Sequence, residues 1–310
     1  MTRPSIISML LGVYLSLICL APNAFCQLTV LSSGNIKVQW RGTQLDLIRS
    51  QLADVEVKGQ LRSELESQLS WLSAWKPGSL TDTATWEQKS SGSLLTEPTV
   101  DPSGLASPLR ERLLGKQAKP TAQDTSRLQA ALVQHDQDIG LRQLHLHWLD
   151  QKQYRQKYLS EIIDAADQLA GMLDQVNPQT DDSRLARAFC YYRLCRALIY
   201  RESPEATAEK PIQDIASHES RLLAAYTQMI ELSGKERPEF ILVEVRMLRR
   251  DNWLGQALVK LEGHAATVEK QWYLKKRRDL LKELGWSAPA QEAEKVYAAA
   301  FPEAVAKERS

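Results

Sequence analysis

The sequence contains little cysteine, little net charge and only one long apolar run, and each shortage excludes a class of protein. Four of the 310 residues are cysteine, too few for a disulfide-rich scaffold. Basic residues number 39 and acidic residues 38, and this balance argues against nucleic acid as a partner. No second apolar run follows the first, so we expect no integral membrane span in the mature chain.

The first residues have the pattern of an export signal. Arg3 precedes an uncharged apolar run at 6–20, and small residues follow within Ala21–Gln27. A basic start, an apolar run and a small-residue exit are typical of a secretory signal peptide. We therefore predict a signal peptide at 1–26 and export to the periplasm or the exterior. The alternative is a retained anchor, either an uncleaved leader or a lipid on Cys26.

Two cysteines remain after the leader, and their spacing argues against a disulfide. Cys190 and Cys195 fall five residues apart in one predicted helix, which places them about 140° apart around its axis. A disulfide needs Cα atoms within about 7 Å and Cβ vectors that face each other. We expect two free, buried thiols.

Composition divides the rest of the chain into three parts. Residues 27–75 alternate around a Ser-Gly-Asn turn and then place leucines on one helical face, which predicts a short hairpin and a helix. Residues 76–120 are rich in Ser, Thr, Pro and Gly and predict a flexible linker, interrupted by a short helix at 107–115. Residues 121–310 repeat apolar residues at helical spacing between turn residues, which predicts an α-helical repeat domain.

The predicted fold class is therefore all-α, a helical array preceded by a small amino-terminal segment and a linker. Pro238 fits the first turn of one helix and Gly285 the end of another. The helix at 183–202 is apolar on two sides, as expected inside a stack. A helix pair takes roughly 34–50 residues, the range of helical repeats.

The segment Arg250–Leu258 resembles the inter-helix turn of a tetratricopeptide repeat. Ala257 matches the small residue that lets two helices approach, and Leu261 the large apolar residue four positions later. A second likeness is to the three characteristic residues of the second helix of the same repeat, which here are similar to Ala293, Tyr297 and Ala300. The resemblance implies a tetratricopeptide-like superhelix with a concave groove that holds a peptide or a partner helix.

Motifs for catalysis are absent from the sequence. It contains no His-Glu-x-x-His, Cys-x-x-Cys, Gly-x-Ser-x-Gly or phosphate-binding loop. His145 and His147 form the one close histidine pair. On a strand they could share a metal ion, but on a helix they point in opposed directions, and the segment 141–149 fits either structure. They are weak metal candidates, and we expect no cofactor.

Positive charge is concentrated in the carboxyl-terminal helices. From Arg237 to Lys282 there are eleven basic and six acidic residues. Such residues either keep helix faces solvated or line a basic groove, where arginine can bind carboxylates through two hydrogen bonds. The candidate ligand-binding residues are Arg246, Arg249, Arg250, Lys275, Lys276, Arg277 and Arg278, with Trp272 and Tyr273 beside them.

These patterns favour an exported, non-catalytic binding or scaffold protein that uses a helical-repeat surface. We expect a protein or peptide partner, and the basic residues favour an acidic peptide or another anionic partner. The alternative hypothesis is a cell-envelope hydrolase built on the same helices, with the segment 76–120 as a lid.

Overall fold

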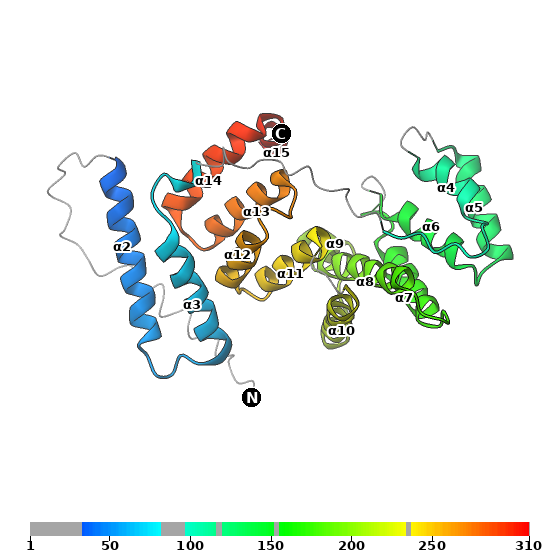
Figure 1. Cartoon of the computed structure of the whole chain (residues 1–310), viewed down its shortest axis with the longest axis horizontal. Helices are drawn as coiled ribbons and strands as arrows, with labels where there is room; N and C mark the ends of the chain where they lie inside the picture. Colours follow the sequence, from blue (N-terminus) through cyan, green and yellow to red (C-terminus); the bar gives the residue numbers. More distant parts are fainter. Residues whose placement is uncertain (1–32, 82–96, 116–119, 152–154, 234–236, 310) are drawn as a thin grey trace.

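The structure is a computed structural model that describes residues 33–81, 97–115, 120–151, 155–233 and 237–309 (Figure 1). All regular secondary structure within these ranges is helical, which confirms the predicted all-α class. None of the helices in these ranges is long and apolar enough to cross a membrane. The predicted signal peptide at 1–26 lies outside the described residues.

Most of the helices follow one another with short connections, and the longest interval, 82–106, lies between η1 and α4. In chain order they are α2 (Ser33–Leu52), α3 (Gly59–Ala74), the 3-10 helix η1 (Ser79–Thr81), α4 (Ser107–Leu114), α5 (Ala122–Gln134), α6 (Ile139–Leu149), α7 (Leu159–Asp174), α8 (Asp181–Arg201), α9 (Pro204–Glu209), α10 (Ile215–Ser233), α11 (Pro238–Arg250), α12 (Leu254–Gly263), α13 (Lys270–Glu283), α14 (Ser287–Ala300) and α15 (Pro302–Arg309).

Two hydrophobic clusters form the interior. The α8 cluster takes its buried side chains from α4 to α11 and includes Leu144, Leu169 and Leu194. The α12 cluster takes its side chains from α2, α3 and α11 to α15 and includes Leu72 and Leu258. Figure 1 shows the helices of the α12 cluster on the left, those of the α8 cluster on the right and α11 between them.

Helix α11 belongs to both clusters. Phe240, Val243 and Met247 are buried in the α8 cluster, whereas Ile241 and Val245 are buried in the α12 cluster. A helix with apolar residues on two sides must be covered on both. Helix α11 is therefore the wall that the two clusters share.

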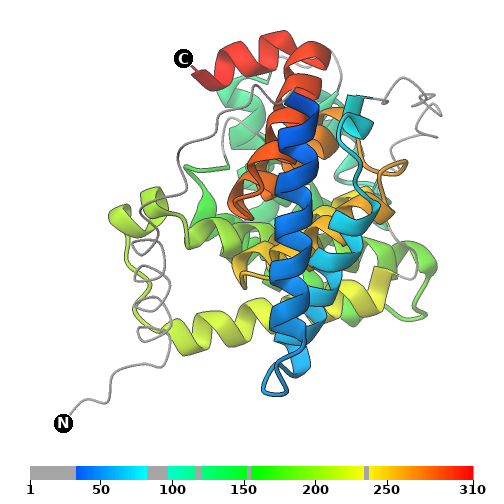
Figure 2. The same ribbon diagram turned by 90° about the vertical axis from the view of Figure 1, so that its left-hand side faces the viewer.

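The first helices of the chain pack against the last ones. Helix α2 lies beside α3, and α3 packs against α12, so α2 is the outermost helix on this side (Figures 1 and 2). The buried carboxylate of Glu64 on α3 accepts hydrogen bonds from the backbone N–H groups of Gly255 (2.5 Å) and Gln256 (2.9 Å). These N–H groups open α12 and have no partner within their own helix, so Glu64 caps α12 from another element.

The predicted hairpin near the amino terminus is wrong over the described residues. Residues from Ser33 onward form α2, and the preceding residues lie outside the described ranges. Leu45 and Ile48 of α2 are buried in the α12 cluster, and Arg41 donates to the backbone oxygen of Leu72 at 2.9 Å. Tertiary packing of this kind overrides a local strand preference, because an isolated two-stranded hairpin is only marginally stable in water.

Several local predictions are confirmed. Cys190 and Cys195 are buried and free on α8, and α4 forms where the sequence predicts a short helix. The corner before α12 contains Asn252 at a φ of 63°, a conformation that asparagine tolerates. Gly140 lies in the first turn of α6. A Cβ atom there would lie 2.3 Å from Asp101 Oδ1, so the close approach of this side chain requires glycine.

We predict that Gly255→Ala lowers the free energy of unfolding by about 1–3 kcal/mol. The added Cβ would lie 2.5 Å from Gln68 Cγ, 2.8 Å from Glu64 Oε1 and 3.1 Å from the backbone nitrogen of Gln68. Gly171→Ala is the control, because the space around Gly171 in α7 is open, and alanine there should add about 0.5–1 kcal/mol. Urea unfolding measures both, and equal effects at the two positions would contradict the packing.

Candidate functional site

A hollow of about 560 Å³ opens on the shared wall, between the end of α8, the end of α11 and the end of α13. We call it the α11 hollow. Its lining residues are Ile199, Tyr200, Ser203, Arg246, Arg249, Arg250, Asn252, Leu254 and Glu283. Its volume falls within the range of small-molecule sites, and three of its lining residues belong to the candidates that the sequence identifies.

The spacing of α11 explains why its arginines meet. Arg246 precedes Arg249 and Arg250 by three and four residues, so the three side chains emerge on neighbouring parts of one helix face. Arg249 and Arg250 also stand in the last turn, where positive charge complements the helix dipole. The opposite faces of α11 are buried in the two clusters, which directs the arginines into the hollow.

Arg249 and Arg250 are neutralised by carboxylates of other helices. Arg249 makes two contacts with Glu283 of α13, of which the bond from Nε to Oε2 is 2.6 Å. Arg250 donates to Glu202 at 2.7 Å and to both carboxylate oxygens of Glu219. These contacts hold α8, α10, α11 and α13 around the hollow.

Arg246 and Lys276 are not neutralised in this way. Among the described residues, neither side chain has a hydrogen bond or an ion pair. Lys276 stands seven residues, about two turns, before Glu283 on α13, so the two side chains share one face of that helix. Arg246 lies one turn before Arg249 on α11, and Lys276 lies two turns before Glu283 on α13, close enough to Arg246 and Arg249 to feel their charges.

The surroundings of these two cations disfavour their charge. Burial lowers the pKa of Arg246, and the neighbouring charges of Arg196, Arg155 and Arg249 lower it further. Burial, followed by the charges of Arg246 and Arg249, lowers the pKa of Lys276 from 10.5 to about 8. An anion placed between them would remove the repulsion that causes part of both shifts.

Lys276 lies beside the lining of the hollow, and the other predicted ligand-binding residues do not line it either. Lys275 pairs with Glu308 at 2.7 Å, and Arg278 pairs with the same carboxylate at 2.9 Å. Three more candidates act elsewhere: Arg277 pairs with Glu262, Tyr273 is buried and donates to the same carboxylate, and Trp272 is exposed. The structure thus brings Arg246, Arg249 and Arg250 together, places Lys276 near them and separates the remaining five.

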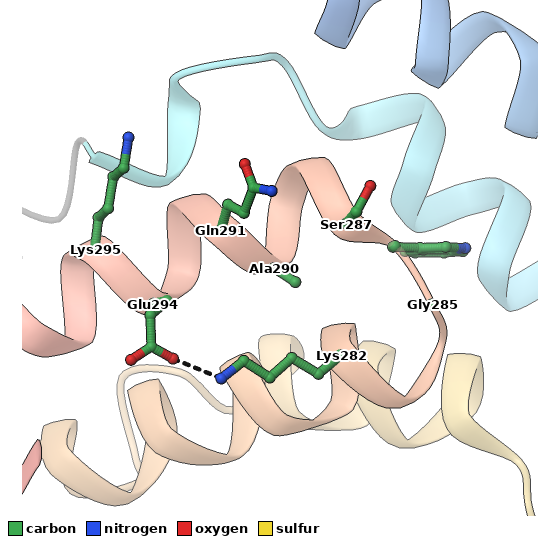
Figure 3. A pocket seen from close by; sticks show the side chains of 8 residues that line it. Lys282, Gly285, Ser287, Ala290, Gln291, Glu294 and Lys295 are labelled. Carbon is green, nitrogen blue, oxygen red and sulfur yellow. Dashed lines mark hydrogen bonds and ion pairs between the residues drawn. The ribbon is translucent and has the colours of Figure 1, made fainter. Parts of the chain in front are cut away.

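A second hollow, of about 530 Å³, lies along the hairpin of α13 and α14 (Figure 3). Lys282 reaches across it to Glu294 at 2.7 Å, and Gln291 and Lys295 point from α14 toward the segment after α3. Its central lysine already has a carboxylate partner, and its other lysine, Lys295, is exposed, whereas Arg246 of the α11 hollow is partly buried.

A buried polar network that the sequence analysis missed lies within the α8 cluster. Glu97 Oε2 lies 2.6 Å from Arg193 of α8 and 2.8 Å from Nε2 of His147 of α6, and all three side chains are largely buried. Nδ1 of His147 lies 3.2 Å from a guanidinium nitrogen of Arg110. A neutral imidazole with its proton on Nε2 suits both contacts, because it donates to Glu97 and accepts from Arg110. The sequence signal for this network is Arg193 itself, a charge among the apolar positions of α8.

The network fixes the segment after residue 97 to α6. Gln143 of α6 donates to Glu97 at 2.9 Å and accepts from the backbone N–H of Val100 at 3.0 Å. Burial raises the pKa of Glu97, but Arg193 and His147 outweigh this effect and lower it to about 2. The carboxylate therefore stays charged, and its role is to hold this segment in place.

The weak metal candidates receive no support from the described geometry. His145 and His147 both lie on α6, so the strand alternative for residues 141–149 is wrong. Two residues apart on a helix, their rings point in different directions. Within the described ranges, no group of three or more His, Cys, Asp or Glu side chains is arranged to hold a metal ion.

Comparison of the chain with known proteins gives no match to a protein family, to a curated protein or to a solved structure. The site must therefore be interpreted from its own geometry.

We predict that Glu97→Gln lowers the free energy of unfolding by about 3 kcal/mol, because it leaves Arg193 buried with less negative charge. The control Glu66→Gln breaks an exposed pair with Arg62 and should cost less than about 0.5 kcal/mol. The pKa of Glu97 falls from 4.5 to about 2 on folding, so its contribution is present above pH 4.5 and is lost as the pH falls toward 2. Urea unfolding between pH 7 and 3 should show less acid sensitivity in Glu97→Gln, and an identical pH profile would contradict this role.

Proposed function

We propose that the protein is a non-catalytic binding protein that captures an anionic group of its partner in the α11 hollow. The observation that carries this proposal is the pair of Arg246 and Lys276, two partly buried cations without a carboxylate partner among the described residues. Every other candidate cation in the region, from Arg249 to Arg278, has at least one carboxylate within ion-pair distance.

Unpaired cations in a partly buried place lower the stability of a folded protein. Perturbed pKa values in a hollow are typical of functional sites, where charge is kept ready for a ligand. A ligand anion would supply the negative charge that Arg246 and Lys276 lack. The hollow therefore has the electrostatics expected of a site that is filled by a partner.

The wider hypothesis remains that of an exported helical-repeat protein. The corner at Asn252 and the buried Ala257 and Leu261 support a tetratricopeptide-like hairpin of α11 and α12. The hydrolase alternative receives less support from this hollow. Glu283 is the one carboxylate among its lining residues, and it is already paired with Arg249.

We predict that Lys276→Met weakens binding of a short polyglutamate peptide at least tenfold, a loss of about 1.4 kcal/mol or more. The same substitution should raise the stability of the free protein by about 1–3 kcal/mol, because it removes a charge that burial disfavours. Fluorescence anisotropy measures the first effect and urea unfolding the second.

Lys275→Met is the matched control on the same helix. Lys275 is already paired with Glu308, whereas Lys276 has no such partner among the described residues, so loss of Lys275 should leave peptide binding unchanged. Unchanged binding in Lys276→Met as well would overturn the assignment of this site.

The alkaline pH dependence gives an independent test of Lys276. Its pKa is lower in the folded protein, about 8, than the ordinary value of 10.5. Between these pH values the unfolded chain binds a proton that the folded protein does not bind, so the contribution of this group to stability rises with pH. We expect the difference in unfolding free energy between Lys276→Met and the parent protein to shrink between pH 8 and 10.5. A difference that is constant over this range would contradict the charge environment described here.

A further inference from the structure

We propose that the anionic group bound in the α11 hollow is a phosphomonoester dianion attached to a ring-sized apolar body. This inference rests on the proposed function and narrows it to one ligand chemistry, which a small molecule or a phosphorylated aromatic side chain of a peptide could supply.

The first step is a count of charge. Arg249 contacts the carboxylate of Glu283, and Arg250 contacts those of Glu202, Glu219 and Asp251, so neither arginine needs a ligand anion. Arg246 in the lining and Lys276 beside it remain without a carboxylate among the described residues, and together they carry up to two positive charges. A carboxylate would neutralise one of them, whereas a phosphomonoester carries a charge of about −1.5 to −2 near neutral pH and would neutralise both.

The second step is the geometry of the donors. Arg246 and Arg249 stand one turn apart, and planar guanidinium groups are suited to the oxygens of a phosphate. Arg249 donates Nε and Nη2 to Glu283 and can offer Nη1, whereas the guanidinium of Arg246 has no hydrogen bond among the described residues. Ser203 and Asn252 add a hydroxyl and an amide to the same lining. A phosphate offers three terminal oxygens and can use more of these donors than a carboxylate can.

The third step is the rest of the lining. One side of the hollow is apolar and is lined by Ile199, Tyr200 and Leu254. The volume of about 560 Å³ exceeds what a bare inorganic ion needs. The hydroxyl of Tyr200 accepts a hydrogen bond from the amide of Gln156, which fixes the position of the ring. An apolar body next to the phosphate would cover this side of the hollow and exclude water from the charged contacts.

Lys276 supplies a second readout, because a bound dianion would favour its charged form. The groups that act on it are Arg246 and Arg249 from α11, and Asp279 and Lys275 from its own helix. Near pH 8 this lysine is about half charged in the free protein, so binding should be accompanied by uptake of up to about half a proton.

The experiment compares three ligands that share one ring. Phenyl phosphate carries a dianion, phenyl sulfate has nearly the same shape with a single charge, and benzoate carries a single carboxylate. We expect isothermal titration calorimetry with the full chain at pH 8 to give at least tenfold tighter binding, about 1.4 kcal/mol, for phenyl phosphate than for the other two. In two buffers of different ionisation enthalpy, phenyl phosphate alone should show proton uptake. Inorganic phosphate should bind more weakly than phenyl phosphate, because it lacks the ring.

Lys276→Met tests the count of charge directly. This variant should bind phenyl phosphate and phenyl sulfate with equal affinity, whereas Lys275→Met should keep the preference for phosphate. A phosphotyrosine peptide tested beside phenyl phosphate distinguishes the sources, because tighter binding of the peptide assigns the ligand to a protein partner.

The outcomes separate this inference from the function it rests on. If benzoate, phenyl sulfate or polyglutamate binds as tightly as phenyl phosphate and Lys276→Met weakens them all, the phosphomonoester is wrong and the anion site stands. If none of these ligands binds at concentrations up to about 10 mM, both proposals fall.

Discussion

Carboxylates buried at contacts between distant parts of the chain are the interaction on which the fold depends. Glu64 caps α12 from α3, and Glu292 of α14 accepts from Lys37 at 2.5 Å and from the backbone of Gly78 at 3.0 Å. Glu262 of α12 accepts from Trp71 of α3 and from Arg277 of α13. Each carboxylate joins the first helices to the last, so removing one would leave several donors buried without a partner. Glu97 has the same role in the α8 cluster.

The pairing of most candidate cations with carboxylates sets the α11 hollow apart from the structural contacts. The chain is nearly neutral, and its candidate cations are mostly held by specific carboxylates, as Arg277 is by Glu262. Lys275 and Lys276 are adjacent in sequence, yet one side chain finds Glu308 and the other meets Arg246 and Arg249. Arg246 and Lys276 lack such a carboxylate among the described residues, and a charge left without a partner beside a hollow is the pattern expected where function opposes stability.

How much of this could be predicted from the sequence depends on how local the cause is. Helix ends set by one residue were predictable, because Pro238 and Gly285 restrict the backbone where they stand. The helical state of α2 was not, because it depends on packing against α3 and on burial of Leu45 and Ile48 in the α12 cluster, whose other helices come from the far end of the chain. The excess of positive charge was visible, but a helix seen alone does not reveal which of four consecutive basic residues faces a neighbour. Glu97 stood in a polar segment, and nothing local marked it as buried.

The position of α11 links binding at the hollow to the whole molecule. Its two buried faces belong to different clusters, and the hollow takes its lining from α8 on one side and from α12 and α13 on the other. An anion held by Arg246 and Lys276 would bridge elements of both clusters, so part of its binding free energy would resist their separation. The hollow is thus placed where a ligand can stabilise the contact that α11 makes with each side. This link between binding and stability follows because α11 has one face buried in each cluster. It would hold for any anion that occupies the site.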